Sequence, residues 1–308
     1  MKKYVVYEAV IGEYDQILQP IVLDENFDYI LFSDTITAPK VGVWQVRSLP
    51  AIDGSNKLKS GFAKCHIEEL LGDYEASLWI DGNIQISSKY VYSRFMELLE
   101  SGVEWASIKH PSQQCTYDEI CAIVELRWVL DSQIVDWYVR LKQKGFPAEW
   151  GLYETNVLYR RHNRCIYDVC KKWWETLAMG VKRDQFSVMY ALWLECPKMA
   201  YYLPNGECPR LGSHHFYYAL HNPHKRIQSL GFHEMMRYRL IRTKYPSNVR
   251  KGYHDMFEWV CTLSIYLSIY LSMVSPKTLL FVWEIFFGFM RMPKLLYNII
   301  KNRLNLYD

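Results

Sequence analysis

The sequence predicts an α/β fold in which a mixed or mostly parallel sheet is covered by helices on both faces, followed by a hydrophobic helical appendage. Short runs rich in β-branched and aromatic residues alternate with stretches that have the apolar spacing of amphipathic helices. Half of the 308 residues are apolar, which is enough to bury a large core. After about residue 235 the chain turns first basic and then strongly apolar, and we place a domain boundary there.

Four candidate strands occupy the first part of the chain. Residues 4–11 and 29–32 are β-rich runs that end in turn-like clusters, and residues 41–46 form a third run. Residues 76–80 are apolar enough for a buried central strand, and they end at Asp81-Gly82-Asn83. Because open α/β sheets bind ligands at the carboxyl ends of their strands, this polar triplet is a candidate site.

The predicted helices alternate with these strands. Helical spacing of apolar residues covers residues 57–71, 91–100, 117–144 and 167–178, with a strand at 156–159 before the last of them. A further helix is expected to begin at Arg183-Asp184-Gln185. The other face of the first helix is basic, through Lys57, Lys59 and Lys64.

Three parts of the chain are expected: an α/β domain over residues 1–235, a basic linker over 236–257 and a tail over 258–308. The tail consists of two apolar stretches, each shorter than the roughly 20 residues that a spanning helix needs, and a basic amphipathic end. A tail that rests on a membrane surface is therefore favoured over one that spans it.

Composition excludes several classes of protein. The net charge of +3 is too small for the electrostatic footprint of a nucleic-acid binder, so no nucleic-acid partner is expected. The eight cysteines are scattered and contain no C-x-x-C pair, which favours reduced thiols over a zinc site or a disulfide framework. The first residues meet a carboxylate at Glu8, too early for a secretory signal, and we expect the domain in the cytoplasm, on the cytoplasmic face of a membrane.

The Asp81-Gly82-Asn83 triplet has the chemistry of a cation and phosphate site. Asp81 supplies a carboxylate, Asn83 a carbonyl oxygen, and Gly82 allows the backbone to approach a ligand closely. The triplet by itself is also the composition of a simple turn.

Several stretches in order resemble one family. They are residues 7–15, 29–34, 77–83, 110–111, 115–119, 145–147, 151–158, 160–162, 173–174 and 183–187. Their order resembles the glycosyltransferase-like family that includes plant mucilage-related and turgor-related proteins and many bacterial polysaccharide-cluster enzymes. The resemblance extends over about residues 4 to 190.

The resemblance implies a GT-A fold, a Rossmann-like mixed sheet in which a strand-end acidic motif, often D-x-D, holds a divalent cation and a nucleotide-sugar donor. The implied reaction transfers a sugar from a nucleotide diphosphate to a glycan or lipid-linked acceptor in polysaccharide biosynthesis, with retention of configuration favoured. Here Asn83 stands where a second Asp often stands. A Mn²⁺ or Mg²⁺ requirement is expected, and this departure puts it in doubt.

The same resemblance suggests roles for residues elsewhere in the domain. Gly12 and Asp34 would lie near the base and ribose, and Lys57 or Lys64 near the phosphates, although a solvated helix face is an alternative for the lysines. His214 or His221 would complete the metal site, and Lys225 would bind phosphate. Exposed loop histidines remain an alternative.

The sugar and acceptor region would contain Glu154, Asn156 and Asp184 as the candidate catalytic residues. The alternatives are a turn for Glu154 and Asn156, and an ordinary helix N-terminal carboxylate for Asp184. Two rival functions stay open: a non-catalytic glycan-binding or scaffold protein, and a nucleotidyl- or phosphotransferase on a similar sheet.

Overall fold

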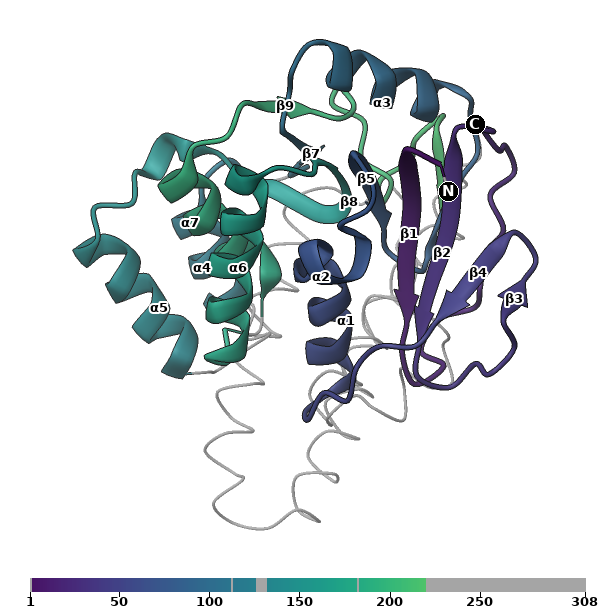
Figure 1. The fold of residues 1–308 in the computed structure, drawn as a ribbon. Helices are drawn as coiled ribbons and strands as arrows, with labels where there is room; N and C mark the ends of the chain where they lie inside the picture. The colour runs from purple at the N-terminus through teal and green to yellow at the C-terminus, as the bar shows by residue number, and fades with distance from the viewer. Residues whose placement is uncertain (1, 112, 126–131, 182, 220–308) are drawn as a thin grey trace, which may run out of the picture. The chain divides into compact units, whose positions relative to one another are not determined.

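The computed structural model describes residues 2–111, 113–125, 132–181 and 183–219. They form a mixed, mostly parallel sheet flanked by helices, which confirms the predicted α/β class (Figure 1). The strands are β1 (Tyr4–Val10), β2 (Phe27–Ser33), β3 (Lys40–Val41), β4 (Trp44–Arg47), β5 (Ala76–Ile80), β6 (Ile84–Ile86), β7 (Trp105–Lys109), β8 (Tyr153–Arg161), β9 (Met199–Tyr201) and β10 (Phe216–Tyr218). The helices are α1 (Asn56–Cys65), α2 (Ile67–Leu71), α3 (Tyr90–Glu100), α4 (Thr116–Glu125), α5 (Ser132–Gln143), the 3₁₀ turn η1 (Ala148–Trp150), α6 (Arg164–Ala178) and α7 (Asp184–Glu195).

The main sheet has the strand order β3-β4-β2-β1-β5-β8-β7-β9. β1 pairs in parallel with β2 on one side and with β5 on the other, and β4 extends β2 in parallel. The other half begins with β8, which runs antiparallel to both β5 and β7. A separate two-stranded sheet pairs β10 with β6, so the last described strand returns to the segment that follows β5.

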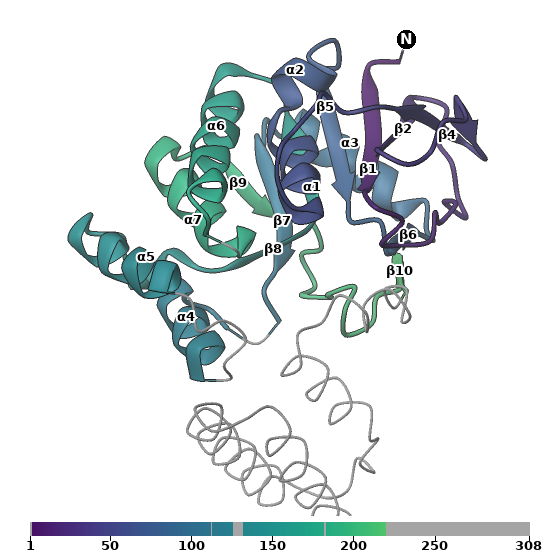
Figure 2. The same cartoon turned by 90° about the horizontal axis from the view of Figure 1, so that it is seen from below.

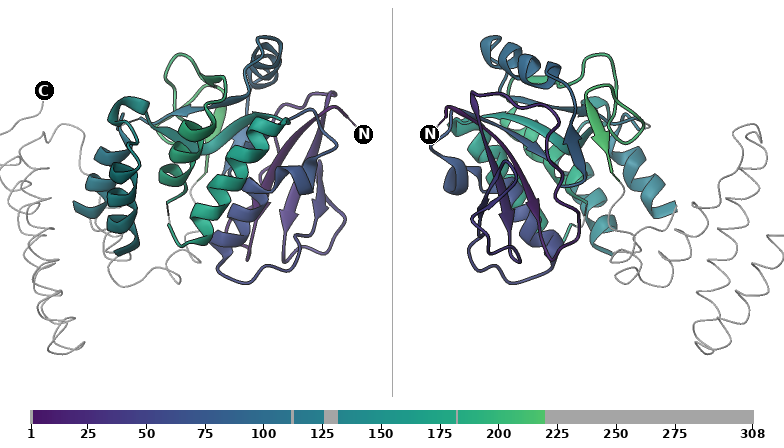
Figure 3. Two further views of the ribbon diagram at one scale, coloured as in Figure 1. Left: turned by 60° about the vertical axis from the view of Figure 1, so that its left-hand side comes forward. Right: turned by 90° about the vertical axis from the view of Figure 1, so that its right-hand side faces the viewer.

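Helices cover both faces of the sheet, as expected for strands that are buried on both sides. α1, α6 and α7 contribute to the apolar core on one face, and α3 contributes to the core on the other (Figure 3). Along α6 the buried positions Ile166, Val169, Cys170 and Trp173 have the i, i+3, i+4, i+7 spacing of one helical stripe. Asn163 caps this helix by accepting a hydrogen bond from the backbone N–H of Ile166 at 3.0 Å.

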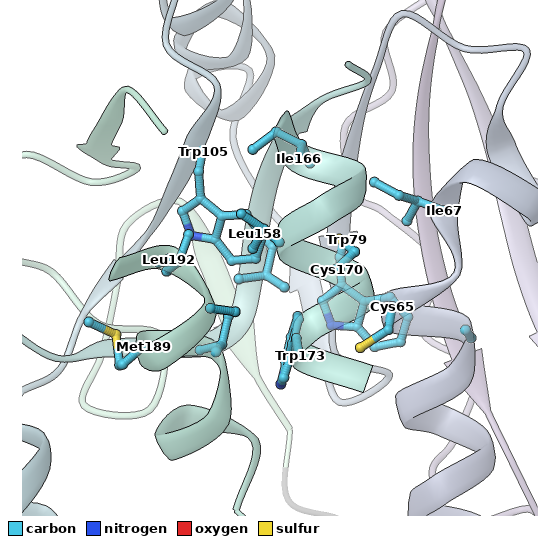
Figure 4. Packing of buried hydrophobic residues seen from close by; sticks show 14 of the residues in the cluster. Cys65, Ile67, Trp79, Trp105, Leu158, Ile166, Cys170, Trp173, Met189 and Leu192 are labelled. Carbon is cyan, nitrogen blue, oxygen red and sulfur yellow. The ribbon is translucent and has the colours of Figure 1, made fainter. Parts of the chain in front are cut away.

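Large aromatic side chains fill the core on the α6 side (Figure 4). The rings of Trp105 and Trp173 lie 6.1 Å apart in an edge-to-face arrangement, and the Trp79 ring lies 5.1 Å from that of Tyr7. All four side chains are almost completely buried. Rings of this size contribute much of the apolar area that stabilises the fold, and these four link β1 with β5 and β7 with α6.

Two predicted elements differ from the observed ones. The predicted helix 57–71 is interrupted at His66, whose backbone leaves the helical region (φ −94°, ψ 47°) while its ring stacks on Phe62 at 3.6 Å. The predicted strand 41–46 is instead a hairpin, because Gly42 adopts a left-handed conformation (φ +60°) that turns the chain between β3 and β4. The predicted helix 117–144 corresponds to α4 and α5, and residues 126–131 between them lie outside the described residues.

Within the described part of the chain, no helix is long and apolar enough to cross a bilayer. The basic linker 236–257 and the tail 258–308 lie outside the described residues. Membrane association through the tail therefore stays a prediction.

Candidate functional site

The strand order of the sheet has a topological switch point at β1, where successive strands are added first on one side of β1 and then on the other. From β1 the chain proceeds to β2 and β4 on one side, and β5 later pairs on the other side. In open α/β sheets, the carboxyl ends of the strands at such a switch point border a crevice that binds ligands. Gly12 follows β1, Asp34 follows β2 and Asp81 follows β5, so three predicted site residues share this edge. Figure 2 views the sheet from the side on which β1 and β2 end.

Lys64 lies at the centre of the candidate site. Its side chain extends from the last turn of α1, and the residue is only 6% exposed. The ammonium nitrogen Nζ lies 3.0 Å from Asp81 Oδ1 and 3.3 Å from Asp184 Oδ2, and it donates to the backbone oxygen of Thr155 at 3.1 Å. An ammonium group has three N–H donors, and here all three have an oxygen acceptor. We call Lys64, Asp81, Thr155 and Asp184 the lysine cluster.

Neighbouring groups fix the orientation of the two carboxylates in the lysine cluster. The indole N–H of Trp79 donates to Asp81 Oδ1 at 2.8 Å, and the hydroxyl of Thr155 donates to Asp184 Oδ2 at 2.7 Å. Asp184 is the first residue of α7, where the helix dipole also favours a negative charge. The fully buried Arg160 donates a hydrogen bond to the backbone oxygen of Lys64 and so fixes the main chain at this residue.

The charges of this cluster stabilise one another. Burial alone would raise the pKa of Asp184, but the positive charges of Lys64 and Lys57 and the Thr155 hydroxyl together bring it well below its usual range. Burial would likewise lower the pKa of Lys64, yet the two carboxylates beside it raise that pKa above its ordinary value. Lys64 and Asp184 are therefore both charged at neutral pH.

Glu154 is the centre of a second group of polar side chains. It is 3% exposed, it accepts a hydrogen bond from Gln185 Nε2 at 3.2 Å and it pairs with Arg210. Burial raises the pKa of Glu154, an effect that Arg210 opposes. Gln185 follows Asp184 on α7, so the first turn of this helix connects Glu154 with the lysine cluster.

His110 joins this second group. Its Nδ1 accepts from the backbone N–H of Gln113 at 3.0 Å, so the proton of the neutral ring lies on Nε2, which faces Glu154 Oε1 at 3.5 Å. Burial, and then the charges of Arg210 and Arg183, lower the pKa of His110 to about 4. Arg183 also pairs with Glu119 at 3.2 Å. We call His110, Glu119, Glu154, Arg183, Gln185 and Arg210 the glutamate cluster.

Gly12 and Asp34 contact each other, as predicted for neighbouring strand ends, and we call this contact the Gly12–Asp34 corner. The Gly12 N–H donates to Asp34 Oδ1 at 2.8 Å, and Lys59 Nζ lies 3.1 Å from Asp34 Oδ2. Gly12 has φ +60°, and a Cβ at this position would lie 2.2 Å from Asn56 Nδ2, so the corner requires glycine. Lys59, to which the sequence assigned no role, is the lysine that pairs with Asp34.

Asn156 is buried beside the lysine cluster. Its backbone oxygen accepts from the N–H of Asp81 at 2.9 Å, and the residue is 6% exposed. Neither the oxygen nor the nitrogen of its side-chain amide has a hydrogen-bond partner among the described residues. Because a buried amide is costly without a partner, this side chain is suited to a water molecule or a ligand hydroxyl.

The predicted metal ligands do not converge within the described residues. Asp81 Oδ1 is engaged by Lys64 and Trp79, and Asn83 is 4% exposed and donates its amide N–H to Ala219 O at 3.0 Å. His214 lies on an exposed loop, while His221 and Lys225 are outside the described residues. No group of three or more metal-binding side chains is present in the described part of the chain. Among the described residues the predicted ligands amount to one carboxylate and one amide, so a divalent cation here would take most of its ligands from water and from a bound substrate.

Sequence reasoning missed several residues that the fold brings to the site. Arg210 was not singled out, and His110, Glu119, Thr155 and Arg183 appeared only within the matching stretches, without a role. A comparison of the sequence with models of protein families and with curated proteins finds no match.

Proposed function

We propose that the chain is a glycosyltransferase that transfers a sugar from a nucleotide diphosphate donor to a hydroxyl of a glycan or lipid-linked acceptor. The lysine cluster at the β1–β5 switch point is the observation that supports this most strongly. It places a buried ammonium and two oriented carboxylates at the edge where open α/β sheets bind nucleotides. In the reaction, the bond between the anomeric carbon and the phosphate oxygen breaks, and the acceptor oxygen bonds to that carbon. The acceptor proton passes to the departing diphosphate or to water.

The residues around the crevice suit different parts of such a donor. The Gly12–Asp34 corner offers a carboxylate to ribose hydroxyls, because the Asp34 carboxylate is already oriented by the Gly12 N–H and Lys59. Lys64 and Lys57 supply positive charge for the diphosphate that leaves. Asp81 and Asp184 offer oxygens that accept hydrogen bonds from sugar hydroxyls.

The glutamate cluster and Asn156 suit the sugar and acceptor side of the reaction. The unpartnered amide of Asn156 can both donate to and accept from a hydroxyl, which is the pattern that a sugar presents. Glu154 is held in place by Gln185 and Arg210, and it directly precedes Thr155 of the lysine cluster on β8. Retention of configuration is favoured by the family resemblance. Inversion would need a positioned general base, a role for which Glu154, whose pKa is raised by burial, and Asp184 are the candidates.

The proposal is tested by incubating the protein with a panel of nucleotide sugars and measuring release of nucleoside diphosphate. We expect release with at least one donor, and a fall of about 100-fold or more for Asp184→Asn, which keeps the shape but removes the charge. Asp168→Asn is the matched control, because Asp168 pairs with Arg164 on the exposed surface of α6. The anomeric configuration of the product, read by NMR, tests retention.

Other products would point to the rival functions. Release of pyrophosphate would indicate a nucleotidyltransferase. Binding of glycans without any binding of nucleoside diphosphates would indicate a glycan-binding module. Either result would contradict the proposed transferase.

A further inference from the structure

The disagreement between the expected metal site and the observed side chains leads to a further inference, which rests on the proposed function. In the lysine cluster, the position between Asp81 and Asp184 is occupied by the ammonium group of Lys64, with distances of 3.0 and 3.3 Å to their oxygens. A divalent cation that bound Asp81 Oδ1 and Asp184 Oδ2 would have to displace this ammonium group. The sequence placed the metal at Asp81 and Asn83, but it did not place Lys64 between two aspartates.

The contacts of Lys64 show that the ammonium is built into the site. Its third N–H donates to the backbone oxygen of Thr155 in a buried hydrogen bond, which an exposed surface lysine would not form. The stem of the side chain is buried, with the Nζ atom 4.8 Å from the centre of the Trp79 ring. An aromatic face and three oxygens together form a complete cation site, and the cation that occupies it is part of the chain.

Charge balance leads to the same conclusion. Asp81 and Asp184 carry two negative charges, Lys64 contacts both of them, and the exposed Lys57 acts on Asp184 from the other end of α1. Two lysines thus balance two aspartates before any ligand binds. A pair of carboxylates attracts a divalent cation strongly only when its negative charge is uncompensated.

We propose that Lys64, with Lys57 at the other end of α1, takes the place of a divalent cation at the Asp81–Asp184 pair, so that the donor binds and reacts without a metal. The positive charge of the exposed Lys57 then helps to neutralise the charge that develops on the departing diphosphate, the task that a metal ion would otherwise perform. Asn83 is consistent with this arrangement, because its amide N–H ties the segment after β5 to Ala219.

The test is calorimetric titration of the full-length protein with UDP, GDP, ADP and CDP, in excess EDTA and in millimolar Mn²⁺. We expect at least one of these diphosphates to bind with the same Kd, within about twofold, in both media. Lys64→Met should weaken that binding about tenfold or more, and Lys64→Arg should restore part of it because it keeps the positive charge. Lys172→Met, which breaks an ion pair between α6 and Glu195 away from the site, is the control and should bind as the wild type does.

A second measurement does not depend on the nucleotide. The electron paramagnetic resonance signal of free Mn²⁺ reports how much of the ion the protein binds. We expect the wild-type protein to leave the signal of free Mn²⁺ unchanged, and Lys64→Met to reduce it, because that variant uncovers two carboxylates.

The outcomes separate this inference from the proposed function. Diphosphate binding that requires Mn²⁺, together with Mn²⁺ binding that is lost in Asp81→Asn, would overturn the inference and leave the transferase intact. A protein that unfolds cooperatively on heating yet binds none of the four diphosphates in either medium would overturn both.

Discussion

The side chain of Glu8 gives a quantitative test of the structure, because its carboxyl group is buried in β1 without a visible partner. The residue has no exposed surface, and neither carboxyl oxygen is hydrogen-bonded among the described residues. Burial, and then the charge of Asp15, raise the pKa of Glu8 well above the ordinary value of a glutamate. We therefore expect the group to be protonated in the folded protein at neutral pH.

The substitution Glu8→Gln should change how the free energy of unfolding depends on pH. In the unfolded chain the glutamate loses its proton at about pH 4.3, whereas the folded protein retains it to a higher pH. The contribution of Glu8 to the free energy of unfolding is therefore fully present below the unfolded pKa. As the pH rises from there towards the folded pKa, that contribution falls by about 1.4 kcal/mol per pH unit. Gln cannot ionise, so the variant should gain on the wild type at that rate above about pH 5, up to the pH at which Glu8 ionises in the folded protein.

Urea unfolding followed by tryptophan fluorescence, at several values between about pH 5 and about pH 8, measures the two free energies of unfolding. Glu97→Gln, on an exposed position of α3, controls for the loss of a surface carboxylate. If the curves of wild type and Glu8→Gln against pH ran parallel, Glu8 would have the same protonation in both states, and our interpretation of its burial would be wrong.

Three further predictions concern other parts of the chain. Gly12→Ala should destabilise the protein by about 1–2 kcal/mol in urea unfolding because Gly12 has a positive φ. The loss should exceed that of Gly145→Ala, since Gly145 also has a positive φ but its new Cβ would lie in open space. Equal losses would show that the contact with Asn56 has no cost. His110 should remain neutral between about pH 5 and about pH 8, because its pKa is lowered to about 4, and an NMR titration of its ring with a midpoint near 6.5 would contradict the buried position. A chain that ends near residue 250 should leave the membrane fraction without detergent and bind nucleoside diphosphate as the full chain does, whereas unchanged fractionation would refute the anchoring tail.

Much of the fold could be predicted because its strands and helices carry strong local signals. β5 was predicted with its observed bounds, since an unbroken apolar run closed by a polar turn has few other interpretations. β6, β7, β9 and β10 were not predicted. Three of them, β6, β9 and β10, are only three residues long, and short strands are defined by the partner strand rather than by their own sequence.

The interrupted first helix shows how tertiary contacts override local pattern. Apolar spacing alone extends the helix through His66, but the stacking of this ring on Phe62 and its edge contact with Trp174 accompany the break. Trp174 belongs to α6, far along the chain. A local pattern has no access to such a contact.

By itself, the sequence determined which polar residues stand at strand ends, and so which edge of the sheet is a candidate site. Gly12, Asp34 and Asp81 follow apolar strands, and parallel strands bring their carboxyl ends to one edge whatever the remaining structure is. Only the tertiary structure decided how the charges pair. Lys64 and Asp184 are 120 positions apart, and they meet because α1 and α7 pack on the same face of the sheet. The pairing of charged side chains depends on distances of a few ångströms between elements, and the order of residues along a chain does not contain those distances.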